Sequence, residues 1–167
     1  MADILGLVVR FLHIVFGIAW MGAVFYGVAV VRIVMPRVEM PARKATMKQL
    51  IPVLTQYIPG SAVLTIVTGA VLYLYLGGFN TFVLFSTTWG LVLLTALLLT
   101  VATFLFGLFV GIGTAKKILA HLNEDACGHG PEVGALQKRF NLANFTVFGL
   151  GLVIIGLMVY ATRGAFG

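Results

Sequence analysis

Charged residues are scarce in this sequence, and their scarcity excludes most water-soluble folds. Only 10% of the 167 residues are charged, whereas 60% are hydrophobic and the mean hydropathy is +1.08. A soluble globular domain has about 25% charged residues. We therefore expect an integral membrane protein in which residues 1–167 form a single transmembrane domain.

Cysteine is also nearly absent, since Cys127 is the only one. A single cysteine excludes an internal disulfide bond and indicates little about the redox compartment. We expect no cleaved signal peptide, because the N-terminus lacks a basic region and the first apolar run is too long for the core of such a peptide. The net charge of +6 does not predict a nucleic-acid partner, because the basic residues gather beside apolar runs.

Four apolar runs are long enough to cross a bilayer, which takes about 20 residues. A backbone inside hydrocarbon must satisfy its own hydrogen bonds, so these runs predict helices over about residues 5–34, 58–76, 89–122 and 132–162. The segment 42–56 mixes basic and apolar residues and predicts a short amphipathic cytoplasmic piece between the first two helices, bent near Pro52. The expected fold is an all-α, four-transmembrane-helix, up-down bundle.

Nine of the eleven basic residues lie between the uncharged core of the first helix and that of the second, or between those of the third and fourth. They are Arg32, Arg37, Arg43, Lys44, Lys48, Lys116, Lys117, Lys138 and Arg139. Basic loops beside spanning helices stay in the cytoplasm. The pattern predicts a protein of the plasma (inner) membrane of a prokaryote, with basic loops in the cytoplasm and both termini outside.

His13 is the only histidine inside an apolar run and the first candidate for chemistry. Gly17 and Trp20 follow it at helical spacing and share its face. Intramembrane ionisable side chains usually face the bundle interior. A neutral imidazole beside a glycine suits an axial ligand of haem b iron. The alternative interpretation is a histidine that forms a hydrogen bond between helices.

A second axial ligand would have to come from another helix. Met158 is the best candidate, because it is expected at the depth of His13, although methionine is more often a packing residue. Arg10 and Arg163 are expected at the same outer edge, where they would pair with haem propionates or simply extend to the membrane surface.

Two further polar groups have alternative interpretations. His121, Cys127 and His129 are metal-ligand types in a short window, but their spacing matches no common zinc site, so a solvated loop competes with a metal site. Gln56, Tyr57, Asn141 and Asn144 either line a polar pocket near the cytoplasmic end or bind across helices. The pairs Gly107–Gly111 and Gly149–Gly151 suit close helix packing.

Residues 12–26, LHIVFGIAWMGAVFY, resemble the first helix of HemJ-type membrane proteins and their CopD-like relatives. The shared pattern is His13, Trp20, Gly22, Phe25 and Tyr26. The resemblance implies a four-helix membrane protein that binds haem b, with His13 as a ligand, in a family linked to protoporphyrinogen IX oxidation. The third helix here lacks the histidine and lysine of that family, and Leu142 replaces its acidic residue. The comparison therefore supports cofactor binding more than catalysis.

The leading functional hypothesis is a small membrane protein that binds haem b or a related porphyrin or redox molecule near the outer leaflet, through His13. It would serve electron transfer or porphyrin redox chemistry. The alternative is a non-catalytic accessory subunit of a larger respiratory or photosynthetic complex. The expected partners are the lipid bilayer and either other membrane subunits or further copies of this chain.

Overall fold

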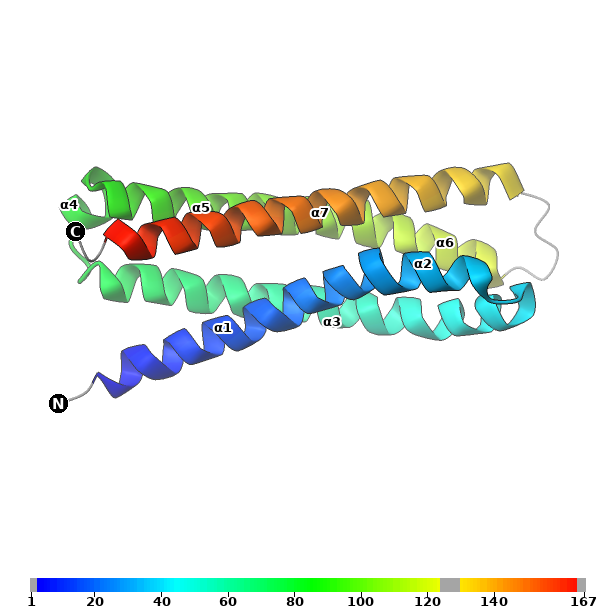
Figure 1. Ribbon diagram of the computed structural model, residues 1–167, viewed down its shortest axis with the longest axis horizontal. Coiled ribbons are helices and arrows are strands. Elements are labelled where there is room, and N and C mark those ends of the chain that lie inside the picture. The colour runs from blue at the N-terminus through cyan, green and yellow to red at the C-terminus, as the bar shows by residue number, and fades with distance from the viewer. Residues whose placement is uncertain (1–2, 124–129, 165–167) are drawn as a thin grey trace.

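Four long helices run side by side along the molecule in the computed structural model (Figure 1). The structure describes residues 3–123 and 130–164, and all regular structure within them is helical. The elements are α1 (Ile4–Phe25), η1 (Tyr26–Val31), α2 (Arg32–Val34), η2 (Met35–Arg37), α3 (Met40–Leu76), α4 (Thr81–Ser86), α5 (Thr88–Phe106), η3 (Gly107–Ile112), α6 (Gly113–Asn123) and α7 (Gly130–Gly164).

Four stretches of helix are long and apolar enough to cross a membrane: Ile4–Arg37, Met40–Leu76, Thr88–Asn123 and Pro131–Thr162. This confirms the all-helical, four-helix expectation at the level of length and composition. At about 1.5 Å per residue each stretch is roughly 50 Å long, whereas the hydrocarbon core of a bilayer is about 30 Å thick. Every helix is therefore longer than the bilayer core requires.

Side chains at the helix starts explain where several elements begin. The Asp3 carboxylate accepts a hydrogen bond from the Gly6 amide at the start of α1 (3.1 Å). Asn80 accepts from the Phe82 amide at the start of α4 (2.9 Å), and Thr87 accepts from the Gly90 amide at the start of α5 (3.0 Å). Such caps satisfy amides that have no partner within the helix.

The second helix is longer than the sequence predicts. It begins at Met40 rather than near residue 58, so the predicted amphipathic piece 42–56 is the first part of α3. Pro52 and Pro59 both lie inside this helix. The Thr55 hydroxyl donates to the Pro52 carbonyl (3.0 Å), and the Ser61 hydroxyl donates to the Tyr57 carbonyl (3.0 Å). Thr and Ser hydroxyls inside a helix commonly donate to a carbonyl three or four residues earlier in this way.

The uncharged connection between α3 and α5 contains the short helix α4. The Tyr73 hydroxyl donates to the Leu84 carbonyl (2.5 Å), and its ring stacks on Trp89 with centroids 6.4 Å apart. A Cβ at Gly90 would collide with the carbonyl oxygens of Val83 and Leu84. The backbone of α4 therefore sits directly on the start of α5.

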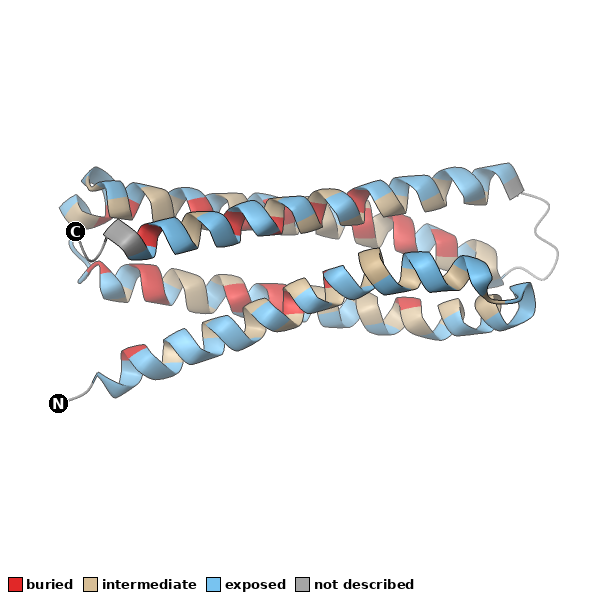
Figure 2. Ribbon diagram, in the orientation of Figure 1, coloured by how far each residue is buried: buried red, intermediate tan, exposed pale blue. Residues whose placement is uncertain are grey.

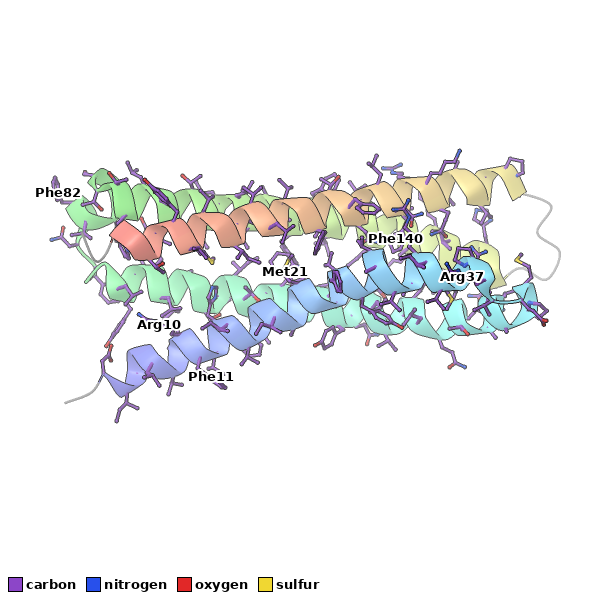
Figure 3. All side chains as sticks on the ribbon, viewed as in Figure 1. Arg10, Phe11, Met21, Arg37, Phe82 and Phe140 are labelled. Carbon is purple, nitrogen blue, oxygen red and sulfur yellow. The ribbon has the colours of Figure 1, made fainter. Side chains whose placement is uncertain are left out.

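Buried residues follow the inner faces of the helices, and most outward positions are exposed (Figure 2). The central cluster comprises Trp20, Val24, Ala62 and Val147. Large apolar side chains such as Phe109, which is 73% exposed, cover the outside, and Figure 3 shows them projecting from every helix. An apolar exterior of this extent suits lipid as the surrounding solvent.

The basic residues of the two connections gather at one end of the bundle. This end is formed by α2, η2, the start of α3, the end of α6 and the start of α7 (Figure 1). Arg37 and Phe140 mark it in Figure 3, whereas Arg10 and Phe82 mark the other half of the molecule. We call it the basic end.

Candidate functional site

The His13 side chain is directed against α3. Its Nδ1 lies 3.0 Å from the Thr65 carbonyl oxygen and 3.3 Å from the Thr68 hydroxyl. A carbonyl oxygen only accepts, so Nδ1 carries the proton and, in the neutral ring, Nε2 keeps its lone pair. A Cβ at Gly69 would lie 2.8 Å from His13 Cε1, so this glycine makes room for the ring.

The helix face that carries His13, Gly17 and Trp20 packs against α3. A Cβ at Gly17 would lie 3.9 Å from the Thr65 methyl group. Trp20 is buried in the central cluster with Ala62 and Val147. The shared face of His13, Gly17 and Trp20 is thus a helix contact, as the alternative interpretation of His13 expects.

Met158 and Arg10 were also predicted near the outer end. Met158 is half-buried in the last turns of α7, and the N-terminal half of α1 diverges from α7 (Figure 1). The pairing of His13 with Met158 as axial ligands stays a prediction. Arg10 is exposed, and α1 contacts α7 further along, where Met21 packs against Gly151 (Figure 3).

The predicted metal-ligand window is described only in part. Cys127 and His129 lie outside the described residues. His121 Nε2 lies 3.8 Å from a Glu132 carboxylate oxygen and links α6 to α7. Within 3–123 and 130–164 there is no group of three or more His, Cys, Asp or Glu side chains that could hold a metal ion.

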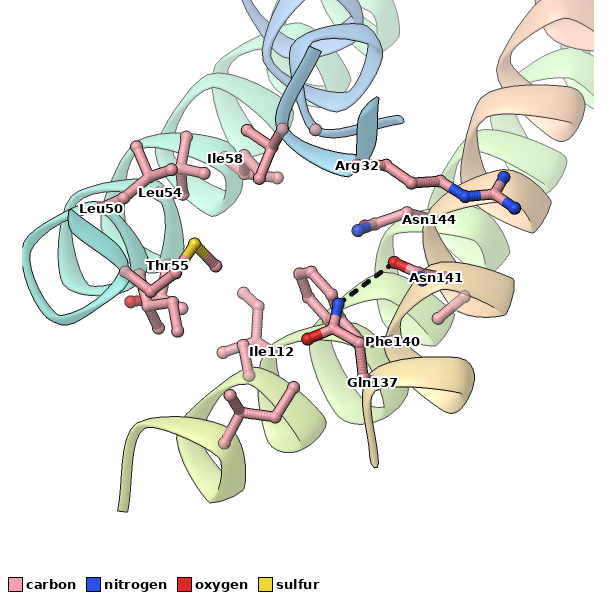
Figure 4. Close-up of a pocket in the computed structure, with 18 of the residues that line it drawn as sticks. Arg32, Leu50, Leu54, Thr55, Ile58, Ile112, Gln137, Phe140, Asn141 and Asn144 are labelled. Carbon is pink, nitrogen blue, oxygen red and sulfur yellow. Dashed lines mark hydrogen bonds between the residues drawn. The ribbon is translucent and has the colours of Figure 1, made fainter. Parts of the chain in front are cut away.

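A cavity of about 620 Å³ opens between α1–α2, α3, η3–α6 and α7 in the half of the bundle that carries the basic end (Figure 4). Its deep end is formed by Trp20, Val24, Phe104 and Val147, and its walls include Leu50, Leu54 and Ile58 of α3. Neither His13 nor Gly17 lines it. Binding pockets for small molecules are typically apolar and about 300–1,000 Å³ in volume.

Two π-helical segments face this cavity. Gly27 and Val31 of η1 line it from the first helix, and Gly107 and Gly111 of η3 line it from the third. A Cβ at Gly111 would meet nothing within 4 Å, although the residue is buried, so it would enter the cavity. π-helical turns are rare and occur frequently at functional sites. Gly111 therefore borders open space instead of the close helix packing that its sequence spacing suggests.

The amide side chains that line the cavity all come from α7. Gln137, Asn141 and Asn144 lie on one face of α7. The Gln137 side-chain amide donates to the side-chain oxygen Oδ1 of Asn141 (3.3 Å, Figure 4). The predicted polar pocket thus includes Asn141 and Asn144. Gln56 and Tyr57 are exposed and do not line it.

The cationic part of the lining comes from α2 and α3. Arg43 and Lys44 lie at the start of α3 and are half-buried. The Arg32 guanidinium reaches α7 and lies 4.6 Å from the Phe145 ring centroid. Among the described lining residues there is no carboxylate. The cavity therefore combines an apolar interior, amide groups and a positively charged rim.

Compared with known protein families, curated proteins and solved structures, the chain shows no match. The resemblance to HemJ-type proteins stays a prediction from the residues of the first helix. The cavity, by contrast, depends on the spacing of four helices and is visible only in three dimensions.

Proposed function

We propose that this protein is a membrane-embedded binding protein whose ligand, a largely apolar molecule with polar groups at one end, occupies the cavity at the basic end. The observation that carries this proposal is the cavity itself, bordered by two π-helical segments and by open space beside Gly111. Haem b, a porphyrin and other redox amphiphiles belong to this class of ligand, so the predicted redox role is retained as a proposal.

Trp20 offers a direct readout of occupancy. It is 5% exposed and lines the deep end of the cavity, so bromine atoms in bulk lipid have little access to it. The only other tryptophan, Trp89, stacks on Tyr73 near α4 and does not line the cavity. In a Trp89→Phe background, fluorescence quenching by brominated fatty acids or their methyl esters therefore reports entry into the cavity.

The test fills the cavity from Gly111. Gly111→Phe should abolish saturable quenching of Trp20, because the added ring takes the space of the ligand. Gly22→Phe is the matched control, since Gly22 is exposed and a Cβ there meets nothing within 4 Å. Saturable quenching that persists in Gly111→Phe would overturn the proposal. Gly111→Leu provides a smaller filling side chain if the phenylalanine variant does not fold.

A second candidate function is haem b binding through His13. The bond from Nδ1 to the Thr65 carbonyl supports it, because metal-ligating histidines usually donate their other ring N–H to such an acceptor. The donor chemistry of His13 fits one axial ligand, and Met158 stays the predicted second ligand. Bound haem would supply one-electron redox chemistry, and His13 would hold and orient it.

The visible spectrum of the purified protein tests this second candidate. It predicts a Soret band that is lost in His13→Ala. A colourless preparation without extractable haem would contradict it, and the cavity proposal would be unaffected.

A further inference from the structure

Every charged side chain among the described residues that line the cavity is basic, and these residues lie at one end of the fold. Moving from the bundle centre towards the basic end, the first charged residues on the four helices are Arg32, Lys48, Lys116 and Arg139. This ring of charge indicates where hydrocarbon gives way to water. The cavity lies on both sides of that level, because its lining runs from Trp20 to the start of α3.

The apolar part of the cavity is deep. Trp20 precedes Arg32 by twelve residues, which is roughly 18 Å of helix at about 1.5 Å per residue. Next to Trp20 the lining is Val24, Phe104 and Val147, without a charged group. A ligand that fills the cavity thus needs an apolar body that enters the bundle and a head that remains at the charged level.

Arg43 is the best-placed group to select that head. It is half-buried in the lining, and its guanidinium makes no side-chain hydrogen bond or ion pair with the described residues. Lys44 and Arg32 also line the cavity, and the Arg32 guanidinium lies over the Phe145 ring of α7. Glu39 and Glu132, two of the acidic residues that the structure describes, are exposed and do not line the cavity. A guanidinium binds carboxylate and phosphate groups through paired hydrogen bonds.

We infer that the ligand of the cavity is an anionic amphiphile, with its carboxylate or phosphate head at Arg43 and its apolar body directed towards Trp20. This inference rests on the proposed function, because it names the chemical class for the same cavity. The amphiphile enters from the leaflet at the basic end, where its head is already at the level of the rim.

The experiment compares probes that share a chain and differ in charge. Brominated stearic acid is ionised at neutral pH, whereas its methyl ester is neutral. In the Trp89→Phe background the acid should quench Trp20 at an about tenfold lower concentration than the ester, because a hydrogen bond to a charged group is stronger than one between neutral groups. Arg43→Gln should remove this preference. Arg37→Gln, which removes an exposed charge at the same end outside the lining, should keep it.

Brominated phospholipids distinguish the two sources of the anionic head. Brominated phosphatidylglycerol has a phosphate head with a net negative charge, whereas brominated phosphatidylcholine has a phosphate head without net charge. Vesicles of the two lipids are compared. Stronger quenching by phosphatidylglycerol assigns a lipid phosphate, and a preference confined to stearic acid assigns a free carboxylate.

Two results separate the failure of this inference from that of the proposed function. If acid and ester bind equally and Gly111→Phe abolishes both, the cavity binds a ligand but the charge selection is wrong. The same holds if Arg37→Gln lowers the acid preference as much as Arg43→Gln. If Gly111→Phe abolishes neither, the proposed function itself is wrong.

Discussion

His13 and Gly69 form one structural unit between two helices. The imidazole donates to the Thr65 carbonyl, and its Cε1 occupies the space that a side chain at Gly69 would need. A buried polar group without such a partner would lower the free energy of unfolding by about 1–3 kcal/mol. The contact between α1 and α3 therefore depends on a glycine at this position.

Alanine substitutions at two glycines of α3 should have opposite effects. Replacing a helical glycine by alanine usually stabilises by about 0.5–1 kcal/mol, and Gly60→Ala should do so because nothing lies within 4 Å of its new Cβ. Gly69→Ala should destabilise by about 1–3 kcal/mol, because the methyl group displaces the His13 ring. Thermal unfolding in detergent measures both, and effects of the same sign would refute the described His13 packing.

Asp3 illustrates how a residue at a helix start also joins two elements. The Tyr75 hydroxyl, on the last turns of α3, donates to the Asp3 carboxylate (2.6 Å), which also accepts from the Gly6 amide (3.1 Å). The Tyr75 bond is the larger cause, and together they hold the pKa of Asp3 below its ordinary value of 3.8. The start of α1 is thereby fastened to the end of α3.

The stability of this junction should depend on pH in a defined direction. The folded-state pKa of Asp3 is depressed, so its contribution is complete above the ordinary value of 3.8 and is lost as the pH falls through the lower folded-state pKa. The protection of amides in the first turns of α1 against hydrogen exchange, corrected for the intrinsic pH dependence of exchange, should fall on acidification through that range. Tyr75→Phe should weaken this pH dependence, and Tyr160→Phe, at an exposed position, should leave it intact.

At the scale of elements, the sequence predicts the existence of the helices better than their ends. Apolar runs reveal four spans, because lipid requires every outward position to be apolar. The early start of α3 is not predicted, since prolines such as Pro52 and Pro59 usually interrupt helices. The helix α4 is missed because its short sequence has little helical preference outside its contact with Gly90.

The candidate site is only partly readable from the sequence. Asn141 and Asn144 stand out in the sequence, because an amide side chain is energetically unfavourable in an apolar helix unless it forms hydrogen bonds. Both line the cavity. The π-helical segments have no sequence signal, so the open space at Gly111 could not be inferred from its spacing to Gly107. The pairing of His13 with Met158 stays a prediction, because depth along a helix does not report on the distance between helices.

At the scale of the whole molecule, the basic end sets the orientation that we propose. The charged connections should face the cytoplasm, with both termini outside. In intact cells a membrane-impermeant maleimide should not label Cys127 until the membrane is opened. In a Cys127→Ser background, Thr81→Cys at the start of α4 should be labelled without opening it. The reverse pattern of labelling would invert the proposed orientation.

The accessory-subunit hypothesis also belongs to this scale, and it stays a prediction. It expects the chain to co-purify with larger membrane subunits in mild detergent, whereas migration as an isolated monomer would argue against it. A ligand in the cavity is compatible with either state, because the cavity is built by one chain.

The most direct test is to measure occupancy of the cavity by the quenching of Trp20 fluorescence. With Trp89 replaced by phenylalanine, brominated stearic acid should quench Trp20 saturably in the parent protein and in Gly22→Phe, and should fail to do so in Gly111→Phe. Equal saturable quenching in all three proteins would contradict the central claim that this cavity binds the ligand.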